Sequence, residues 1–140
     1  MIKVLVFGTF DGLHEGHLDF FRQAKEYGDH LMAVVGRDST VLSIKNKLPK
    51  QDENERLSKV QACGLVDYAR LGNEGISKYE VIRELKPDVI CLGYDQVLGY
   101  DKVYFTDVLK KKIQGMGLKI KIKRLKPYKP DQFHSSILNK

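Results

Sequence analysis

The chain has 140 residues, of which 42% are hydrophobic and 30% are charged, and its formal net charge is +6. This length suits a single domain over residues 1–140, which buries about two-thirds of the surface of the unfolded chain. We find no charged and apolar N-terminal leader and no apolar run near the roughly twenty residues of a membrane-spanning helix, so we expect a cytoplasmic protein that does not enter a membrane. The positive charge suits a phosphorylated ligand, either nucleic acid or a small molecule.

In the first half of the chain, short β-prone runs alternate with helical patterns. Residues 2–7 form an apolar run that predicts a strand, and residues 18–27 have a helical period, with Gly28 as the expected end of that helix. A second strand is predicted at residues 31–35. Residues 37–50 are basic, include a proline and show no clear period, so we expect a loop there.

The second half continues this alternation. Asp52, with Glu55 three residues further on, is a typical start for a helix that ends near Gly64. The remaining elements are expected in this order: a strand at residues 66–71, a helix from the Ser-x-x-Glu capping box at Ser77 to about Lys86, a strand at residues 89–92, a helix at residues 105–116 and a strand at residues 118–125.

Strands that alternate with helices indicate a doubly wound, mostly parallel sheet with helices on both faces, a Rossmann-like α/β fold. In such sheets a ligand lies beyond the carboxyl ends of the strands, at the point where the strand order reverses. Two polar loops follow predicted strands, at residues 8–17 and residues 93–96. We therefore expect these two loops to be neighbours at the ligand site.

The loop after the first strand contains two histidines, His14 and His17, three residues apart. If a helix begins near Glu15, both rings lie one turn apart at its positive end, beside backbone N–H groups that have no partner within the helix. Such a place favours phosphate. Gly8 permits a tight turn before the histidines, and Gly16 allows a ligand to approach the backbone.

Two other interpretations of the histidine pair stay open. One ring could be a helix cap or a packed side chain without contact to a ligand. The pair could also bind zinc, although His30 and His134 lie in unrelated settings and supply no third ligand at the usual spacing.

Residues 8–17 have the sequence GTFDGLHEGH, which resembles the GTFDxxHxGH signature of the cytidylyltransferase-like nucleotidyltransferases at every fixed position. That family transfers a nucleotidyl group from a nucleoside triphosphate to a phosphate-bearing acceptor and releases pyrophosphate. The resemblance implies the same activity here, together with five parallel strands in the order 3-2-1-4-5. It also implies a set of nucleotide-binding residues in this segment: Gly8, Thr9, Phe10, His14, Gly16 and His17.

Attack on the α-phosphate places negative charge on the non-bridging oxygens and on the leaving pyrophosphate, so catalysis depends on positioning and electrostatic stabilisation. His14 and His17 can donate N–H groups to those oxygens, as the paired histidines of the family do, and they are candidate catalytic residues. A phosphate monoester acceptor has a second pKa of about 6 and needs no general base at neutral pH. We expect a divalent cation, Mg²⁺, to bridge phosphate oxygens with few protein ligands, and Asp11 either touches it or holds the turn.

Basic residues at two places resemble family residues that reach the triphosphate. Lys45 or Lys47, in the predicted loop after the second strand, resembles the lysine that contacts phosphate oxygens, and the spacing leaves open which of the two does so. Both are candidate catalytic cations, and the alternative is a solvated loop lysine. Arg56 is similar in position to a family arginine in the following helix, and the alternative is an ordinary surface arginine.

Residues 86–96 have the sequence KPDVICLGYDQ, which resembles the KPDxxxLGxDQ stretch of the archaeal-type FAD synthetases that adenylylate FMN. This resemblance favours ATP over CTP, and it implies nucleotide contacts for Gly93, Asp95 and Tyr128. The arginine–threonine pair in the RTEGIST-type motif of glycerol-3-phosphate cytidylyltransferases is missing from this chain.

Two adjacent hydroxyl side chains, Ser135 and Ser136, follow the last predicted strand. Paired hydroxyls can open a short helix that faces phosphates, and the family has a comparable Ser/Thr-rich helix start. We favour a phosphate-binding role for both serines, and a plain N-cap is the alternative.

The leading hypothesis is a nucleotidyltransferase that moves the adenylyl group of ATP to FMN and forms FAD and pyrophosphate. The alternative reaction is cytidylyl transfer from CTP to glycerol 3-phosphate or another phosphorylated polyol. From a different class, a nucleotide- or RNA-binding module without activity could keep the fold and the basic surface, but it would not need both histidines. We expect no nucleic-acid partner, and because the family often forms dimers we consider a homodimer.

Overall fold

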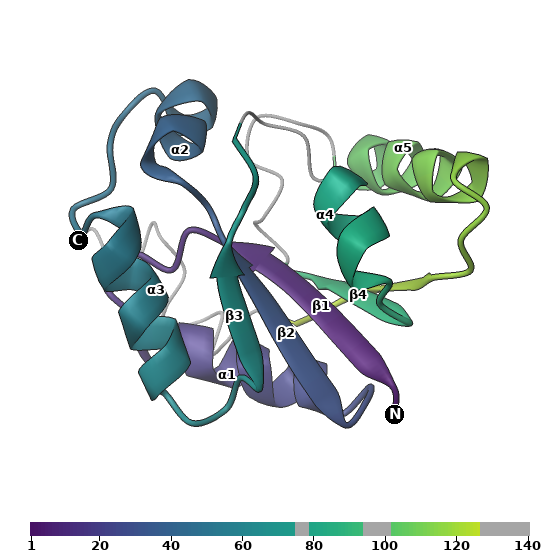
Figure 1. Cartoon of the computed structure of the whole chain (residues 1–140), viewed down its shortest axis with the longest axis horizontal. Helices are drawn as coiled ribbons and strands as arrows, with labels where there is room; N and C mark the ends of the chain where they lie inside the picture. Colours follow the sequence, from purple (N-terminus) through teal and green to yellow (C-terminus); the bar gives the residue numbers. More distant parts are fainter. Residues whose placement is uncertain (75–78, 94–101, 127–140) are drawn as a thin grey trace.

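Five parallel strands form the centre of the computed structural model, which describes residues 1–74, 79–93 and 102–126. They are paired in the order β3-β2-β1-β4-β5, and Figure 1 shows β3, β2, β1 and β4 side by side. The doubly wound α/β class and the expected strand order are therefore confirmed. The strands are β1 (Lys3–Gly8), β2 (His30–Val35), β3 (Tyr68–Leu71), β4 (Val89–Leu92) and β5 (Lys121–Arg124).

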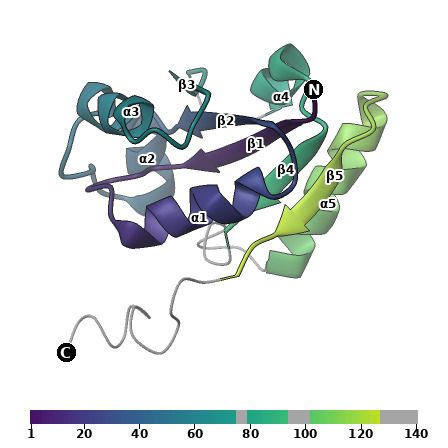
Figure 2. The same ribbon diagram turned by 90° about the horizontal axis from the view of Figure 1, so that it is seen from below.

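Helices connect these strands and cover both faces of the sheet. In Figure 2, α1 runs below the strands and α4 lies above them. No helix in the described part of the chain is long and apolar enough to cross a membrane. The helices are α1 (Glu15–Lys25), α2 (Asp38–Lys45), α3 (Glu53–Ala62), α4 (Tyr79–Leu85) and α5 (Lys102–Gly115).

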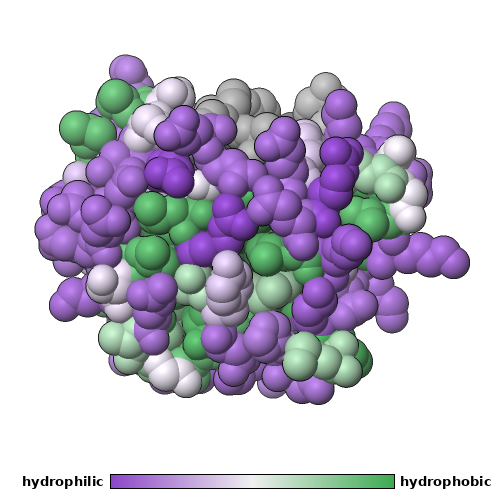
Figure 3. Space-filling view, viewed as in Figure 1, coloured by the Kyte–Doolittle hydropathy of each residue, from purple (hydrophilic) through white to green (hydrophobic). Residues whose placement is uncertain are grey.

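The hydrophobic core has two layers, because alternate residues of a strand point to opposite faces of the sheet. Val4 and Val6 of β1 pack with Phe21 of α1 in one cluster, which also contains residues of α3. Leu5, between those two valines, packs with Ile82 of α4 in a second cluster that includes residues of α5. Outside these layers, hydrophilic side chains dominate the face drawn in Figure 3.

The strand order reverses at β1, which lies between β2 and β4. The register pairs Gly8 with Val35 of β2 and Val6 with Cys91 of β4. The carboxyl ends of these parallel strands therefore meet at one edge of the sheet. This confirms the expectation that the loop after β1 and the start of the loop at Gly93 are neighbours.

The prediction of a loop over residues 37–50 is wrong, because Asp38–Lys45 form helix α2. Arg37 is the N-cap residue of this helix, and its side chain makes no capping hydrogen bond. Instead, Glu53 at the start of α3 accepts the backbone N–H of Asp38 at 2.9 Å, and Asp38 accepts that of Glu53 at 3.3 Å. Each helix start caps the other, and such long-range contacts leave no local sequence pattern.

The other predicted elements are present, with ends that differ by a few residues. Helix α1 begins at Glu15, and α3 is capped as expected, because Asp52 accepts the backbone N–H of Glu55 at 2.8 Å. The strand expected at residues 118–125 is shorter, at Lys121–Arg124. The predicted cap of α4 at residue 77 lies outside the described residues.

The core assignment can be tested on two leucines. Leu5 has no exposed surface, whereas Leu48, in the segment between α2 and α3, is 61% exposed. We expect Leu5→Ala to lower the free energy of unfolding by about 2–5 kcal/mol because it leaves a cavity in the core. Leu48→Ala is the matched control and should change this free energy by less than about 0.5 kcal/mol in denaturant titrations. Equal losses in the two variants would contradict the assigned core.

Candidate active site

Two histidine side chains cap the start of α1. His14 is the N-cap residue, and its Nδ1 accepts the backbone N–H of Gly16 at 3.0 Å. The backbone N–H of His14 in turn donates to Nδ1 of His17 at 3.1 Å. This reciprocal pair is a capping box, in which the two side chains satisfy two N–H groups that the helix itself leaves without partners. The predicted start of a helix near Glu15 is therefore confirmed.

The two imidazole rings are stacked. Their centroids are 3.9 Å apart and their planes differ by 25°. Because each Nδ1 accepts a backbone N–H, the neutral form of each ring carries its proton on Nε2. His14 and His17 therefore bring two N–H donors together at the N-terminus of α1, and the convergence expected from their spacing is confirmed.

The His17 ring is neutral at physiological pH. The pKa of His17 is lowered from 6.5 to about 4, mainly by burial and also by the neighbouring His14 and Lys45, while Asp11 opposes them. The ring also packs edge-on against Phe10, with the centroids 5.6 Å apart. The donor that His17 offers is thus a neutral N–H group and not an imidazolium.

The turn between β1 and α1 has an unusual backbone. Phe10 has a φ of 55° and Gly12 has a φ of 62°, both in the left-handed region. The Phe10 ring is only 4% exposed, and a Cβ on Gly8 would lie 2.6 Å from its Cζ. Gly8 therefore serves to let this ring fold back against the strand, and not only to permit a tight turn. Phe10 was predicted to bind nucleotide, but its side chain belongs to the core, so any such contact would involve its backbone.

Of the two candidate lysines, the structure brings Lys45 into the site. Lys45 is the last residue of α2, and its Nζ donates to Oγ1 of Thr9 at 3.1 Å. Lys47 follows the left-handed Asn46 beyond the helix, is exposed, and makes no hydrogen bond or ion pair with any other described residue. Helix α2, which the sequence patterns did not predict, therefore distinguishes Lys45 from Lys47, between which those patterns could not choose.

Arg56 is fully buried, so the alternative of an ordinary surface arginine is wrong. Its Nη1 donates to the carbonyls of Thr9 at 2.8 Å and Gly36 at 2.7 Å, and its Nε donates to the carbonyl of Gln51 at 3.0 Å. Its Nη2 pairs with the Asp38 carboxylate at 2.7 Å. In this arrangement the guanidinium joins three loops at the carboxyl edge of the sheet. Its contact with a nucleotide stays a prediction.

Asp11 braces the same turn. Its two carboxylate oxygens accept the backbone N–H groups of Lys50 at 2.8 Å and Gln51 at 2.9 Å. Burial by itself raises the pKa of Asp11, but these hydrogen bonds outweigh it and lower the pKa below the usual value. Asp11 therefore holds the turn, which is one of the two roles considered for it, and its contact with the cation stays a prediction. In the described part of the chain, no group of three or more His, Cys, Asp or Glu side chains could hold a metal ion.

Four predicted site residues lie outside the described residues: Asp95, Tyr128, Ser135 and Ser136. Conversely, Gln51 and Asp38 are part of the loop network around the site, and the sequence patterns did not single them out. Apart from Arg56, which is five residues after Gln51, their partners are between 15 and 40 residues away along the chain, so no local spacing could have revealed them.

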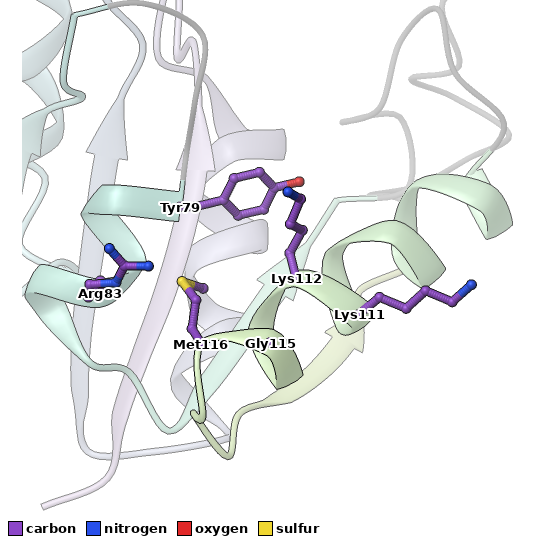
Figure 4. A pocket seen from close by; sticks show the side chains of 6 residues that line it. All are labelled: Tyr79, Arg83, Lys111, Lys112, Gly115 and Met116. Atoms are coloured by element: carbon purple, nitrogen blue, oxygen red, sulfur yellow. The ribbon is translucent and has the colours of Figure 1, made fainter.

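A basic groove on the molecule is separate from this site. It has a volume of about 520 Å³, and Figure 4 shows it between α4 and α5, with Lys112 above the Tyr79 ring at 5.7 Å. Helices α4 and α5 pack on the face of the sheet opposite to α1, so this groove does not adjoin the histidine pair. Its lining residues are Tyr79, Arg83, Lys111, Lys112, Gly115 and Met116.

The lowered pKa of His17 predicts that stability depends on pH. An unfolded histidine binds its proton near pH 6.5, whereas the folded ring does so at about pH 4. The contribution of His17 to stability is therefore present above about pH 6.5 and is lost as the pH falls towards 4. Between about pH 7 and pH 4.5, the wild type should lose more free energy of unfolding in denaturant titrations than His17→Gln, which has no titrating ring. Equal losses would contradict the neutral, buried ring.

Comparisons with known proteins agree with this geometry. The family model described as cytidylyltransferase-like matches residues 5–138. The FAD synthase of Thermoplasma volcanium is 41% identical over 100% of this chain and 93% of its own length. The FAD synthase of Pyrococcus abyssi is 41% identical over 91% of this chain and 81% of its own length.

Solved structures share the same architecture. A crystal structure from Thermoplasma volcanium, described as a lipopolysaccharide core biosynthesis protein, is 41% identical and has a TM-score of 0.81, covering 91% of this chain and 98% of that one. A protein of unknown function from Archaeoglobus fulgidus, 17% identical, has a TM-score of 0.69 over 89% of this chain and 90% of its own, and shares the fold alone. With the signature, the histidine cap and the family match over nearly its whole length, the chain belongs to the cytidylyltransferase-like family.

Proposed function

We propose that this chain transfers the adenylyl group of ATP to FMN and forms FAD and pyrophosphate. The stacked histidine pair at the N-terminus of α1 carries the proposal, because it presents N–H donors where a triphosphate is expected. The choice of ATP and FMN is supported by relatives that are named FAD synthases and are about 40% identical. It is also supported by the resemblance of residues 86–96 to the archaeal-type FAD synthetases.

The reaction forms one P–O bond and breaks another. An oxygen of the FMN phosphate attacks the α-phosphorus of ATP, and the bond from that phosphorus to the oxygen that bridges to the β-phosphate breaks. The leaving group is pyrophosphate. The FMN phosphate is largely dianionic at neutral pH, since its second pKa is about 6, and no residue has to remove a proton from it.

The protein accelerates this step by donors that are already in place. His14 and His17 donate from Nε2 to the oxygens of the triphosphate, where negative charge increases in the transition state. The N-terminus of α1 adds partial positive charge that needs no reorganisation. Lys45, whose Nζ lies beside Thr9, supplies a full positive charge for the leaving phosphates.

A divalent cation fits this site as part of the substrate complex. Mg²⁺ prefers phosphate and water oxygens over a cage made only of protein ligands, and the described residues form no such cage. When bound, Mg²⁺ neutralises charge on the phosphates. Asp11 is engaged with two backbone N–H groups, so the protein contributes mainly the histidine and lysine donors.

Five further residues complete the proposed nucleotide site: Gly93, Asp95, Tyr128, Ser135 and Ser136. The family resemblance gives Asp95 and Tyr128 contacts to the nucleotide, and it gives the two serines contacts to phosphate. Gly93 directly follows β4, the neighbour of β1 at the carboxyl edge. A homodimer and a cytoplasmic location also stay predictions.

Product analysis tests the proposed reaction. The protein is incubated with Mg²⁺, one of the four nucleoside triphosphates, and either FMN or glycerol 3-phosphate, and both pyrophosphate and FAD are measured. We expect FAD and pyrophosphate only with ATP and FMN. Pyrophosphate release with CTP and glycerol 3-phosphate would support the alternative cytidylyltransferase, and binding of triphosphate without turnover of any pair would support a module without activity.

The donor role of His17 predicts a large kinetic effect. His17→Ala should lower kcat by about 10²-fold or more, with a smaller change in KM for ATP, because one preorganised donor to the transition state is lost. Lys119→Ala, an exposed residue after α5, is the control and should leave kcat within about twofold of the wild type. Circular dichroism shows whether each variant is folded. Unchanged kcat in folded His17→Ala would refute the donor role.

Two lysines near the end of α2 form a matched pair. Lys45→Ala should lower kcat/KM for ATP by at least about 10-fold, because the cation beside Thr9 is lost. Lys47→Ala removes the same charge two positions away and should stay within about twofold of the wild type. Steady-state kinetics at several salt concentrations compares them. A similar loss in both variants would indicate that only the net charge of the loop matters.

A further inference from the structure

The turn at residues 9–12 adopts a backbone that L-amino acids rarely take. Phe10 is not a glycine, yet its φ is 55°, and Gly12 has a φ of 62°. Such conformations persist only where surrounding contacts hold them. The turn leads directly to His14, the N-cap residue of α1, and it begins with Thr9, the partner of Lys45. Whatever holds this turn therefore also sets the positions of the phosphate donors.

Gln51 makes two hydrogen bonds to the turn and a third to Arg56. Its side-chain Oε1 accepts the backbone N–H of Gly12 at 3.1 Å, and its backbone N–H donates to Asp11 at 2.9 Å. Its carbonyl accepts the Nε of Arg56 at 3.0 Å. One residue of the segment before α3 thus contacts the turn through both its side chain and its backbone.

Arg56 anchors this arrangement to the core. Its guanidinium is fully buried and donates to the carbonyl of Thr9 at 2.8 Å, at the other end of the turn from Gly12. Its pair with Asp38 at 2.7 Å holds the guanidinium in place. The turn is therefore tied at Thr9 by Arg56, and at Asp11 and Gly12 by Gln51.

We propose that Gln51 is a positioning residue for nucleotidyl transfer, whose side-chain oxygen holds the turn at residues 9–12 and thereby places His14, His17 and Lys45 against the phosphates. The inference rests on the proposed function, and it adds a residue that neither the signature nor the family resemblance identified. Gln51 acts through the turn, because its hydrogen bonds go to protein groups, namely Gly12, Asp11 and Arg56. A small displacement of preorganised donors lowers the rate of transfer strongly.

Gln51→Met tests the role of the side-chain oxygen, because methionine has a similar length but cannot accept the N–H of Gly12 in the same way. The backbone bonds of residue 51 stay available. Gln61→Met is the matched control: Gln61 is exposed on α3, and its side chain donates to the carbonyl of Ala69 at 3.3 Å, away from the turn. Both variants lose one glutamine hydrogen bond, but only one of those bonds reaches the turn.

We expect Gln51→Met to lower kcat by about 10-fold while KM for ATP changes less than about threefold, because donors are misplaced and not removed. In NMR hydrogen exchange, the Gly12 amide should exchange at least about threefold faster. Gln61→Met should change neither quantity. A merely structural residue would lower the melting temperature without this change in kcat per folded molecule.

Two results would overturn the inference: a kcat of Gln51→Met within about twofold of the wild type, or an unchanged exchange rate of the Gly12 amide. These results are distinct from failure of the proposed function. If the wild type forms no FAD with ATP and FMN, the adenylyl transfer fails on that measurement alone. The Gly12 exchange rate then decides whether Gln51 holds the turn.

Discussion

The site depends on how helix α1 begins. Serine, threonine or aspartate commonly caps a helix start, but here the cap is built from His14 and His17. The two backbone bonds that start the helix occupy both Nδ1 atoms, so each neutral ring keeps its proton on Nε2. Burial lowers the pKa of His17 to about 4 and keeps that ring uncharged. The same hydrogen bonds therefore begin a helix and select the tautomer in which both Nε2 atoms are donors.

The buried guanidinium of Arg56 supports the turn that precedes this helix. Arg56 has no exposed surface, and hydrogen bonds to Thr9, Gly36, Gln51 and Asp38 satisfy its guanidinium. Breaking such a buried pair by removing one partner typically destabilises a protein by about 3–5 kcal/mol. The Arg56 guanidinium also has a geometric role. This one rigid group determines the relative positions of the loops that follow β1 and β2 and of the segment before α3.

Neutral and charged donors have separate places in the proposed mechanism. The histidines offer N–H groups on a helix terminus whose geometry is set before substrate binds, as electrostatic preorganisation requires. Lys45 brings a full charge on a long side chain from another helix, and its contact with Thr9 holds it close to the same turn. The basic groove between α4 and α5 lies on the other face of the sheet and takes no part in this arrangement.

Local sequence patterns predicted much of the fold, because hydrophobic periods and helix caps depend on residues that are close in the chain. The alternation of strands and helices, the cap at Asp52 and the convergence of His14 and His17 all follow from such spacing. The strand order came from the family resemblance. Only the tertiary structure shows four further features: helix α2, the burial of Phe10 and Arg56, the difference between Lys45 and Lys47, and the contacts of Gln51 with the turn. These features arise from contacts between segments far apart in the chain, such as the mutual capping of α2 and α3, and no local pattern encodes such contacts.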